Sequence, residues 1–142
     1  MTNFFLPGDI KTHRHPITPA DFADFGPAQG GLVHAVCSTF ALAREMEWAA
    51  RLFVLEMKDP DEEGIGTALA IEHEAPAFAG ETLTVTATFA ALAGRHLRCT
   101  VEARVGQRLV ATGHTEQHIV PRARLAARFA ALHAAPPPAP DR

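Results

Sequence analysis

Cysteine and positive charge are both scarce in this chain, and each shortage excludes a class of protein. The two cysteines, Cys37 and Cys99, stand in no cluster of cysteine and histidine at metal-ligand spacing. We therefore expect reduced thiols and no structural zinc site. The 13 lysines and arginines are outnumbered by 16 aspartates and glutamates, for a formal net charge of −3. This balance removes the broad electrostatic attraction to nucleic acid or to an anionic membrane, so we expect neither partner.

Long apolar runs and a signal for export are also missing. The opening segment Met1–Pro7 has no basic region, and Pro7 interrupts its apolar run after three residues, so it does not have the pattern of a secretory signal. No other apolar run is long enough to span a bilayer. The sequence therefore predicts a cytoplasmic protein. Its 142 residues are enough for one domain with a core of its own.

Proline and glycine separate a broken N-terminal arm from a long helix. Residues 1–31 contain four prolines and several glycines, and they predict at most one short strand near 8–13. Residues 38–57 have no glycine or proline and are rich in helix formers, with Ser38 or Thr39 available as the N-cap. This helix is apolar around most of its circumference, so we expect other elements to wrap around it.

The two-residue period of half-buried strands follows the helix. It covers residues 66–74, 82–93, 96–105 and 108–120, with Gly94 and Gly106 in the predicted hairpin turns. One long central helix wrapped by a curved antiparallel sheet of about five strands is an α+β hotdog fold. We predict a hotdog domain over 1–121, a short amphipathic helix over 122–134 and a disordered proline-rich tail over 135–142.

Three polar residues stand where an apolar or structural residue would be ordinary. Alternation places His73 on the helix-facing side of its strand, as a buried histidine held by one hydrogen bond or as a catalytic group. Glu47 lies among apolar helix residues, and an inward orientation would make it a usable general base. We expect the nearby Glu45 to be the solvated one. Thr39 is either a plain N-cap or a group that orients a carbonyl or a water near the first helical turn.

Spacing within the helix limits how these residues can combine. Eight residues of regular helix rise about 12 Å, so Thr39 and Glu47 cannot touch within one straight helix. Cys37, near the start of that helix, is either a nucleophile with a lowered pKa or a small buried residue. A set of hairpin arginines could meet the phosphates of coenzyme A or could form a solvated face: Arg95, Arg98, Arg104 and Arg108.

The segments 37–50, 64–67 and 76–85, together with His73, resemble the fluoroacetyl-CoA thioesterase-like family of hotdog thioesterases. The family pattern is a threonine, a glutamate eight positions later and a histidine twenty-six positions after that, which correspond here to Thr39, Glu47 and His73. The resemblance implies hydrolysis of a short to medium acyl-CoA thioester by these three catalytic residues, without a metal or organic cofactor. It also implies a homodimer, or a dimer of dimers, in which the strand bearing His73 pairs with its symmetry mate.

The chain departs from the family pattern at three places. Phe40 replaces the proline that usually follows the threonine, and Gln117 replaces an arginine at the end of the last strand. The aromatic lid associated with the fluorinated substrate is not evident in residues 30–36, so we expect no special preference for fluoroacetyl-CoA. Two alternatives remain from the residues alone, a non-catalytic acyl-CoA binding module and a hotdog hydratase or dehydratase.

Overall fold

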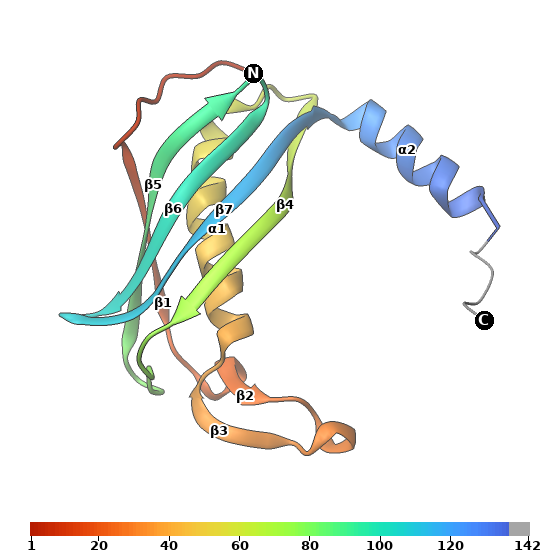
Figure 1. Cartoon of the computed structure of the whole chain (residues 1–142). Coiled ribbons are helices and arrows are strands. Elements are labelled where there is room, and N and C mark those ends of the chain that lie inside the picture. Colours follow the sequence, from red (N-terminus) through yellow and green to blue (C-terminus); the bar gives the residue numbers. More distant parts are fainter. Residues whose placement is uncertain (137–142) are drawn as a thin grey trace.

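The computed structural model describes residues 1–136 and shows one sheet curled around one long helix (Figure 1). The sheet has five antiparallel strands in the order β1-β5-β6-β7-β4. Its strands are β1 (Ile10–Pro16), β4 (Glu62–His73), β5 (Thr82–Ala93), β6 (His96–Val105) and β7 (Arg108–Pro121). The helix α1 (Thr39–Met57) lies in the concave face of the sheet. This is the architecture predicted from the sequence.

The packing of α1 explains why the sequence is so apolar there. Its sheet-facing side is fully buried, and the core fills between it and β5, β6 and β7. The large side chains at its centre are Leu42, Met46 and Phe53, each with no exposed surface. The wrapping is incomplete, however, because Phe40, Trp48 and Leu55 on the outer side remain substantially exposed in a single chain. One sheet therefore covers one side of this helix and leaves an apolar outer side uncovered.

A β-bulge interrupts β4 near its middle. Gly66 pairs with Gln117 of β7, whereas Ala68 pairs with Glu116, so Thr67 is an extra residue with no partner in the ladder. Ordinary pairing resumes and continues to His73. The two edge strands of the sheet are β1 and β4, and no strand within residues 1–136 pairs with the outer side of β4.

The N-terminal arm has more structure than the sequence predicted. Besides β1 it contains the 3-10 turns η1 (Pro19–Asp21) and η2 (Pro27–Gln29) and a two-stranded ribbon of β2 (Phe22–Asp24) and β3 (Leu32–Cys37). The ribbon lies beyond the N-terminal end of α1 (Figure 1). The sequence did not predict these strands, because the prolines and glycines beside them break the alternation that marks a strand.

At the other end of the chain, α2 (Arg122–Ala134) extends away from the sheet (Figure 1). None of its residues is buried, and Phe129 and Leu132 are exposed. Of the tail predicted over 135–142, residues 137–142 lie outside the described part of the chain. No helix within residues 1–136 is long and apolar enough to cross a membrane.

Glu62, the first residue of β4, is a buried carboxylate that contacts three other parts of the chain at this end of the sheet. A hydrogen bond from the backbone N–H of Asp59, at 3.0 Å, and the charges of Arg95 and of the Met1 amino group lower the pKa of Glu62 to about 2. The folded protein therefore holds the ionised form more strongly than an unfolded chain does.

Replacing Glu62 by glutamine should make stability less dependent on pH. Because the pKa of Glu62 is depressed in the fold, its contribution is fully present above pH 4.5, its ordinary value, and is lost as the pH falls toward 2. We expect Glu62→Gln to lower the free energy of unfolding at pH 7 and the gap from wild type to close in acid, as measured by urea denaturation. The exposed Glu74→Gln is the control, and a gap of constant size across this range would contradict the assignment.

Candidate functional site

Thr39 and His73 meet where α1 begins and β4 ends. Ser38 is the N-cap of α1, since its hydroxyl oxygen accepts from the backbone N–H of Ala41 at 3.0 Å. Thr39 is thereby left free of the capping role that the sequence allowed for it. Its Oγ1 lies 3.0 Å from Nδ1 of His73. Two residues separated by 34 positions in the chain therefore form one hydrogen-bonded pair.

The hydrogen bond made by the second ring nitrogen of His73 determines which atom donates and which accepts in this pair. Nε2 lies 3.0 Å from the backbone carbonyl oxygen of Ala75, which can only accept, so Nε2 carries a hydrogen. In the neutral ring Nδ1 then has the lone pair and accepts from the hydroxyl of Thr39. A hydroxyl hydrogen-bonded to an imidazole that a third group orients is an arrangement suited to proton transfer.

His73 is exposed in the single chain, although it faces the start of the helix as alternation predicted. The sequence predicted either a buried histidine held by one hydrogen bond or a catalytic group on this helix-facing side. The difference arises because β4 is an edge strand, and within residues 1–136 only β7 pairs with its His73 end.

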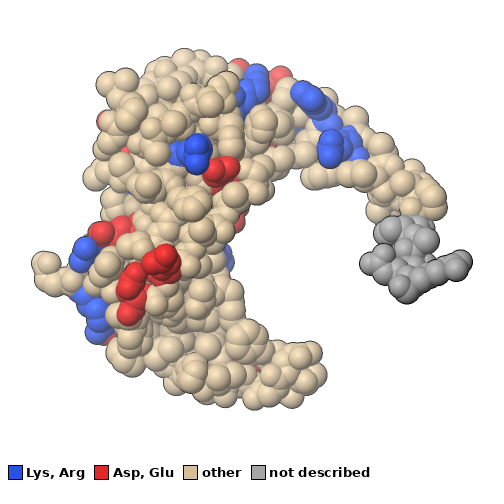
Figure 2. All heavy atoms as spheres, in the orientation of Figure 1, with Lys and Arg blue, Asp and Glu red and all other residues tan. Residues whose placement is uncertain are grey.

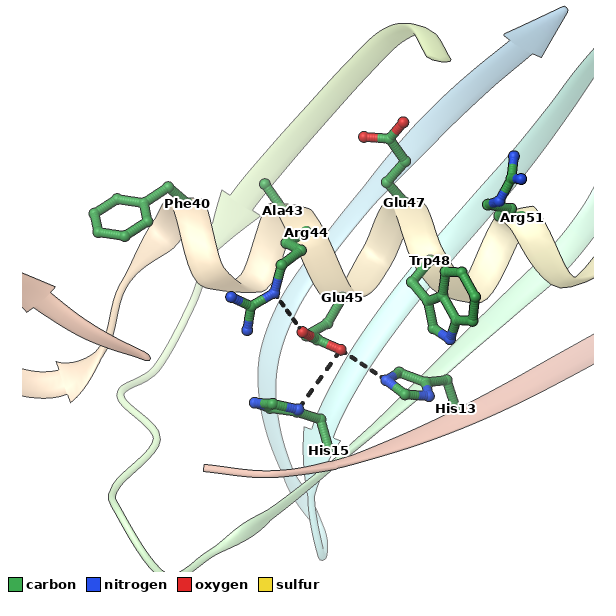
Figure 3. A pocket seen from close by; sticks show the side chains of 9 residues that line it. All are labelled: His13, His15, Phe40, Ala43, Arg44, Glu45, Glu47, Trp48 and Arg51. Carbon is green, nitrogen blue, oxygen red and sulfur yellow. Dashed lines mark hydrogen bonds and ion pairs between the residues drawn. The ribbon is translucent and has the colours of Figure 1, made fainter. Parts of the chain in front are cut away.

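Glu47 and Glu45 have the opposite environments to those predicted. Glu47 is exposed and its carboxylate lies against Gly66 of β4, whereas Glu45 is 6% exposed. Figure 3 shows the two side chains leaving the helix on opposite sides. Glu45 falls at the 3.6-residue spacing of Leu42 and Ala49, so it belongs to the buried side of α1.

Glu45 is the centre of a cluster of charged side chains between α1 and β1 (Figure 3). Its Oε2 lies 2.7 Å from Nε2 of His13, and its Oε1 accepts from Nε of Arg44 at 2.7 Å. His15 is 3.7 Å from the same Oε2 through Nδ1 and 2.8 Å from Oδ2 of Asp21 through Nε2. Asp21 also accepts from Arg44, at 2.7 Å. Sequence reasoning missed this cluster, although the His-x-His spacing of a strand was visible.

Asp21 is held ionised although it is 2% exposed. Burial acts to raise its pKa, but the hydrogen bonds from the Thr18 backbone N–H, from His15 and from Arg44 outweigh burial and lower the pKa below its ordinary value. The cluster therefore contains a negative charge with its hydrogen bonds satisfied.

An open pocket of about 800 Å³ lies along the outer side of α1. Both carboxylates border it, together with the apolar groups of Phe40, Ala43 and Trp48. Phe25 of the ribbon packs edge-on against Phe40, with ring centroids 5.5 Å apart. An aromatic pair therefore stands at the Thr39 end of the pocket, and residues 30–36 alone did not reveal it.

The three predicted catalytic residues do not all meet within one chain. Thr39 and His73 are in contact, but Glu47 lies against Gly66, seven residues from His73 along β4. Gln117, at the position where the family pattern has arginine, is 2% exposed, and its Nε2 donates to the backbone oxygen of Glu47 at 3.4 Å. Gln117 thereby links β7 to the helix beside Glu47.

Two alternatives lose support from the surroundings of the side chains. Cys37 is 1% exposed, and burial raises the pKa of its thiol to about 11, so it lacks the thiolate character of a nucleophile. The hairpin arginines each have a carboxylate partner on the sheet. The pairs are Arg95 with Glu62, Arg98 with Glu116, Arg104 with Glu102 and Arg108 with Glu81. This pairing favours a structural role for the four arginines over contacts with the phosphates of coenzyme A.

Comparison with known proteins places this geometry among thioesterases. The family model described as "fluoroacetyl-CoA-specific thioesterase" matches residues 17–123. A fluoroacetyl-CoA thioesterase of Streptantibioticus cattleyicolor is 31% identical over 122 residues, 84% of this chain and 81% of that protein. A thioesterase superfamily member of Thermus thermophilus has a TM-score of 0.85 at 31% identity, covering 90% of this chain and 93% of that one. A hot-dog-like protein of Thermanaerovibrio acidaminovorans, 20% identical, has a TM-score of 0.83 over 93% of this chain and 96% of that one, which shows the fold alone.

Proposed function

The chain belongs to the fluoroacetyl-CoA-specific thioesterase family and is an acyl-CoA thioester hydrolase, and we propose that it cleaves short to medium acyl-CoA thioesters with Thr39, Glu47 and His73 as its catalytic residues. The observation that carries this proposal is the hydrogen bond between Thr39 and His73, whose ring is in turn oriented by the carbonyl of Ala75. Family membership favours hydrolysis over the hydratase and over the non-catalytic binding module.

The proposed reaction assigns each group a step in water addition and thiolate release. Glu47 takes a proton from the attacking water, so that a C–O bond forms at the thioester carbonyl. The N–H groups at the start of α1 stabilise the developing oxyanion, while the hydroxyl of Thr39 donates to Nδ1 of His73 and holds that ring beside the thioester. As the C–S bond breaks, the proton that Glu47 took from water passes through Nδ1 of His73 to the sulfur, which yields the free acid and coenzyme A and returns both side chains to their starting state. Direct attack by Glu47, through an acyl-enzyme, is the variant of this scheme that the same residues allow.

We propose that the site is completed by a second copy of the chain. In the part of the chain that the structure describes, the outer edge of β4 has no partner strand, and exposed apolar side chains line the uncovered side of α1. Exposed strand edges and apolar patches of this kind are ordinarily covered in a stable protein. Antiparallel pairing of β4 with its mate covers both at once. The compartment predicted from the sequence, the cytoplasm, stays a prediction.

The register of that pairing determines which residues meet. Gly66 and His73 are six steps of the β4–β7 ladder apart because Thr67 has no partner in it, which is about 20 Å at about 3.3 Å per residue. A two-fold axis at Ala70, which then pairs with its own mate, places Gly66 of one copy opposite His73 of the other. Glu47, which lies against Gly66, then approaches the Thr39–His73 pair across the interface. Each dimer has two such sites, related by the axis.

Mixing two inactive variants tests this shared site. A heterodimer of Glu47→Gln with His73→Ala, purified through two different tags, has one site with both residues intact, so we expect about half of wild-type turnover per dimer. The two homodimers are the inactive controls. A heterodimer as inactive as its parents would place each site within one chain, and a stable monomer in sedimentation would remove the interface itself.

Single substitutions test the chemical roles. Glu47→Gln and His73→Ala should each lower turnover by at least about a hundredfold, because each removes a proton-transfer group. Release of coenzyme A, followed with a thiol reagent, is the measurement, and it separates hydrolysis from hydration and from binding without reaction. Glu56→Gln is the matched control, an exposed glutamate on the same helix. Equal losses at Glu47 and Glu56 would rule out a catalytic Glu47.

Gly66 is predicted to position Glu47. A Cβ atom at this residue would overlap Oε1 of Glu47, the far end of a flexible side chain. We expect Gly66→Ala to push the carboxylate aside and to lower kcat by about a hundredfold, with little change in KM or in the thermal midpoint. In Gly113→Ala the new Cβ would meet the backbone oxygen of Ala70, so that variant should lose stability first. Unchanged kcat in Gly66→Ala would refute the positioning role.

The acyl group is predicted to be short to medium, without special preference for fluorine. Leu32 and Val33 supply aliphatic rather than aromatic surface at the ribbon, and each methylene buried in the pocket contributes up to about 0.8 kcal/mol. We expect kcat/KM for butyryl-CoA and hexanoyl-CoA to equal or exceed that for acetyl-CoA and fluoroacetyl-CoA. A strong preference for fluoroacetyl-CoA would instead assign selectivity to other groups, with Phe25→Ala and Phe40→Ala as the variants to compare.

A further inference from the structure

Two histidines and a buried glutamate point at one another on the opposite side of α1 from Gly66. His13 and His15 are two residues apart on β1, so their side chains share a face of the strand. Glu45 approaches them from the helix, and one ligand atom from each of the three residues lies within 4.8 Å of the other two. Figure 3 shows all three side chains converging between β1 and α1.

We propose that His13, His15 and Glu45 bind a divalent transition-metal ion of the Zn²⁺ type, which joins the edge strand β1 to the helix. This site departs from the expectation that the protein uses no metal, and none of its three ligands is a residue assigned to hydrolysis. Two imidazoles and one carboxylate are donors that Zn²⁺ and its neighbours in the first transition row accept.

The distances suit an ion with little rearrangement. Ligand atoms around a tetrahedral Zn²⁺ with bonds near 2.1 Å are about 3.4 Å apart. Here Oε2 of Glu45 is 2.7 Å from Nε2 of His13 and 3.7 Å from Nδ1 of His15. A shift of about 0.7 Å in the His13 ring would bring the first separation to this value, and the second is already within about 0.3 Å of it. Both histidine side chains are 22% exposed, so an ion has a route in and a position for water.

The surrounding groups orient the ligands as an outer shell does in metal proteins. Nε2 of His15 lies 2.8 Å from a carboxylate oxygen of Asp21, which leaves Nδ1 free to coordinate. Metal-binding histidines commonly donate their second N–H to a carboxylate in this way. Arg44 holds the far oxygens of both acids, Oε1 of Glu45 and Oδ1 of Asp21, and leaves Oε2 of Glu45 for the ion.

The alternative occupant of this space is a proton on each histidine, which would make the cluster an ion-pair network. The two acids and Arg44 carry a combined formal charge of −1, so two protons and one divalent ion would bring the cluster to the same net charge of +1. Only the ion produces a defined coordination spectrum and a stoichiometry of one per chain.

Cobalt provides the direct test. Purified protein, stripped with a chelator, is titrated with Co²⁺ and then with Zn²⁺, while visible absorption and calorimetry follow binding. We expect one ion per chain, a ligand-field spectrum of low coordination number and a raised thermal midpoint. His13→Ala, His15→Ala and Glu45→Gln should abolish the spectrum. Asp21→Asn should weaken affinity by about tenfold or more while keeping the stoichiometry.

The controls separate this site from casual binding. His114→Ala removes an exposed histidine on β7, far along the chain from the cluster, and should leave the titration unchanged. Mg²⁺ should give no thermal shift, since it prefers oxygen ligands. Wild-type protein that shows no stoichiometric Co²⁺ spectrum, or a loss in His114→Ala as large as in His13→Ala, would overturn the proposal, and this readout does not depend on hydrolysis.

Discussion

The position of every functional side chain depends on how α1 packs into the curved sheet. A helix turns about 100° per residue, so burying Leu42, Met46 and Phe53 determines where each polar residue of the helix points. Glu45 then faces β1, and Glu47 faces β4. The same packing sets the start of α1 level with the end of β4, where Thr39 meets His73. A small change in the rotation of this helix would move all these groups together.

The elements predicted best were those whose signal is local. Three of the strands begin where the sequence predicted, because alternation and the hairpin glycines mark their ends. The long helix was evident from a run without glycine or proline, and Ser38 marks its start. The β2–β3 ribbon was missed because Pro27 and Gly30 interrupt it. Its short strands are held by pairing across the arm, and no periodicity within either strand reveals such pairing.

Some residues of the candidate site were likewise predicted from the sequence, and others were not. Thr39 and His73 were identified from a family spacing, and their contact depends on two distant elements ending side by side. The wrong prediction for Glu45 and Glu47 could have been avoided, because Glu45 falls on the buried side of α1 and Glu47 does not. The sequence could not show which side chains contact the buried carboxylate of Glu45. Its partners His13 and His15 lie 32 and 30 residues away, and only the fold brings them together.

The unpaired Thr67 changes which side chains of β4 share a face of the sheet. Gly66 and His73 are an odd number of residues apart, and in a regular strand an odd separation puts two side chains on opposite faces. Both nevertheless face the helix, since a side chain at Gly66 would meet Glu47 and His73 reaches Thr39. The extra residue at the bulge restores the match. A single residue of chain length thus decides whether the imidazole lies on the concave or the convex surface. In this fold, the number of residues in one strand shapes the candidate site as much as their chemistry does.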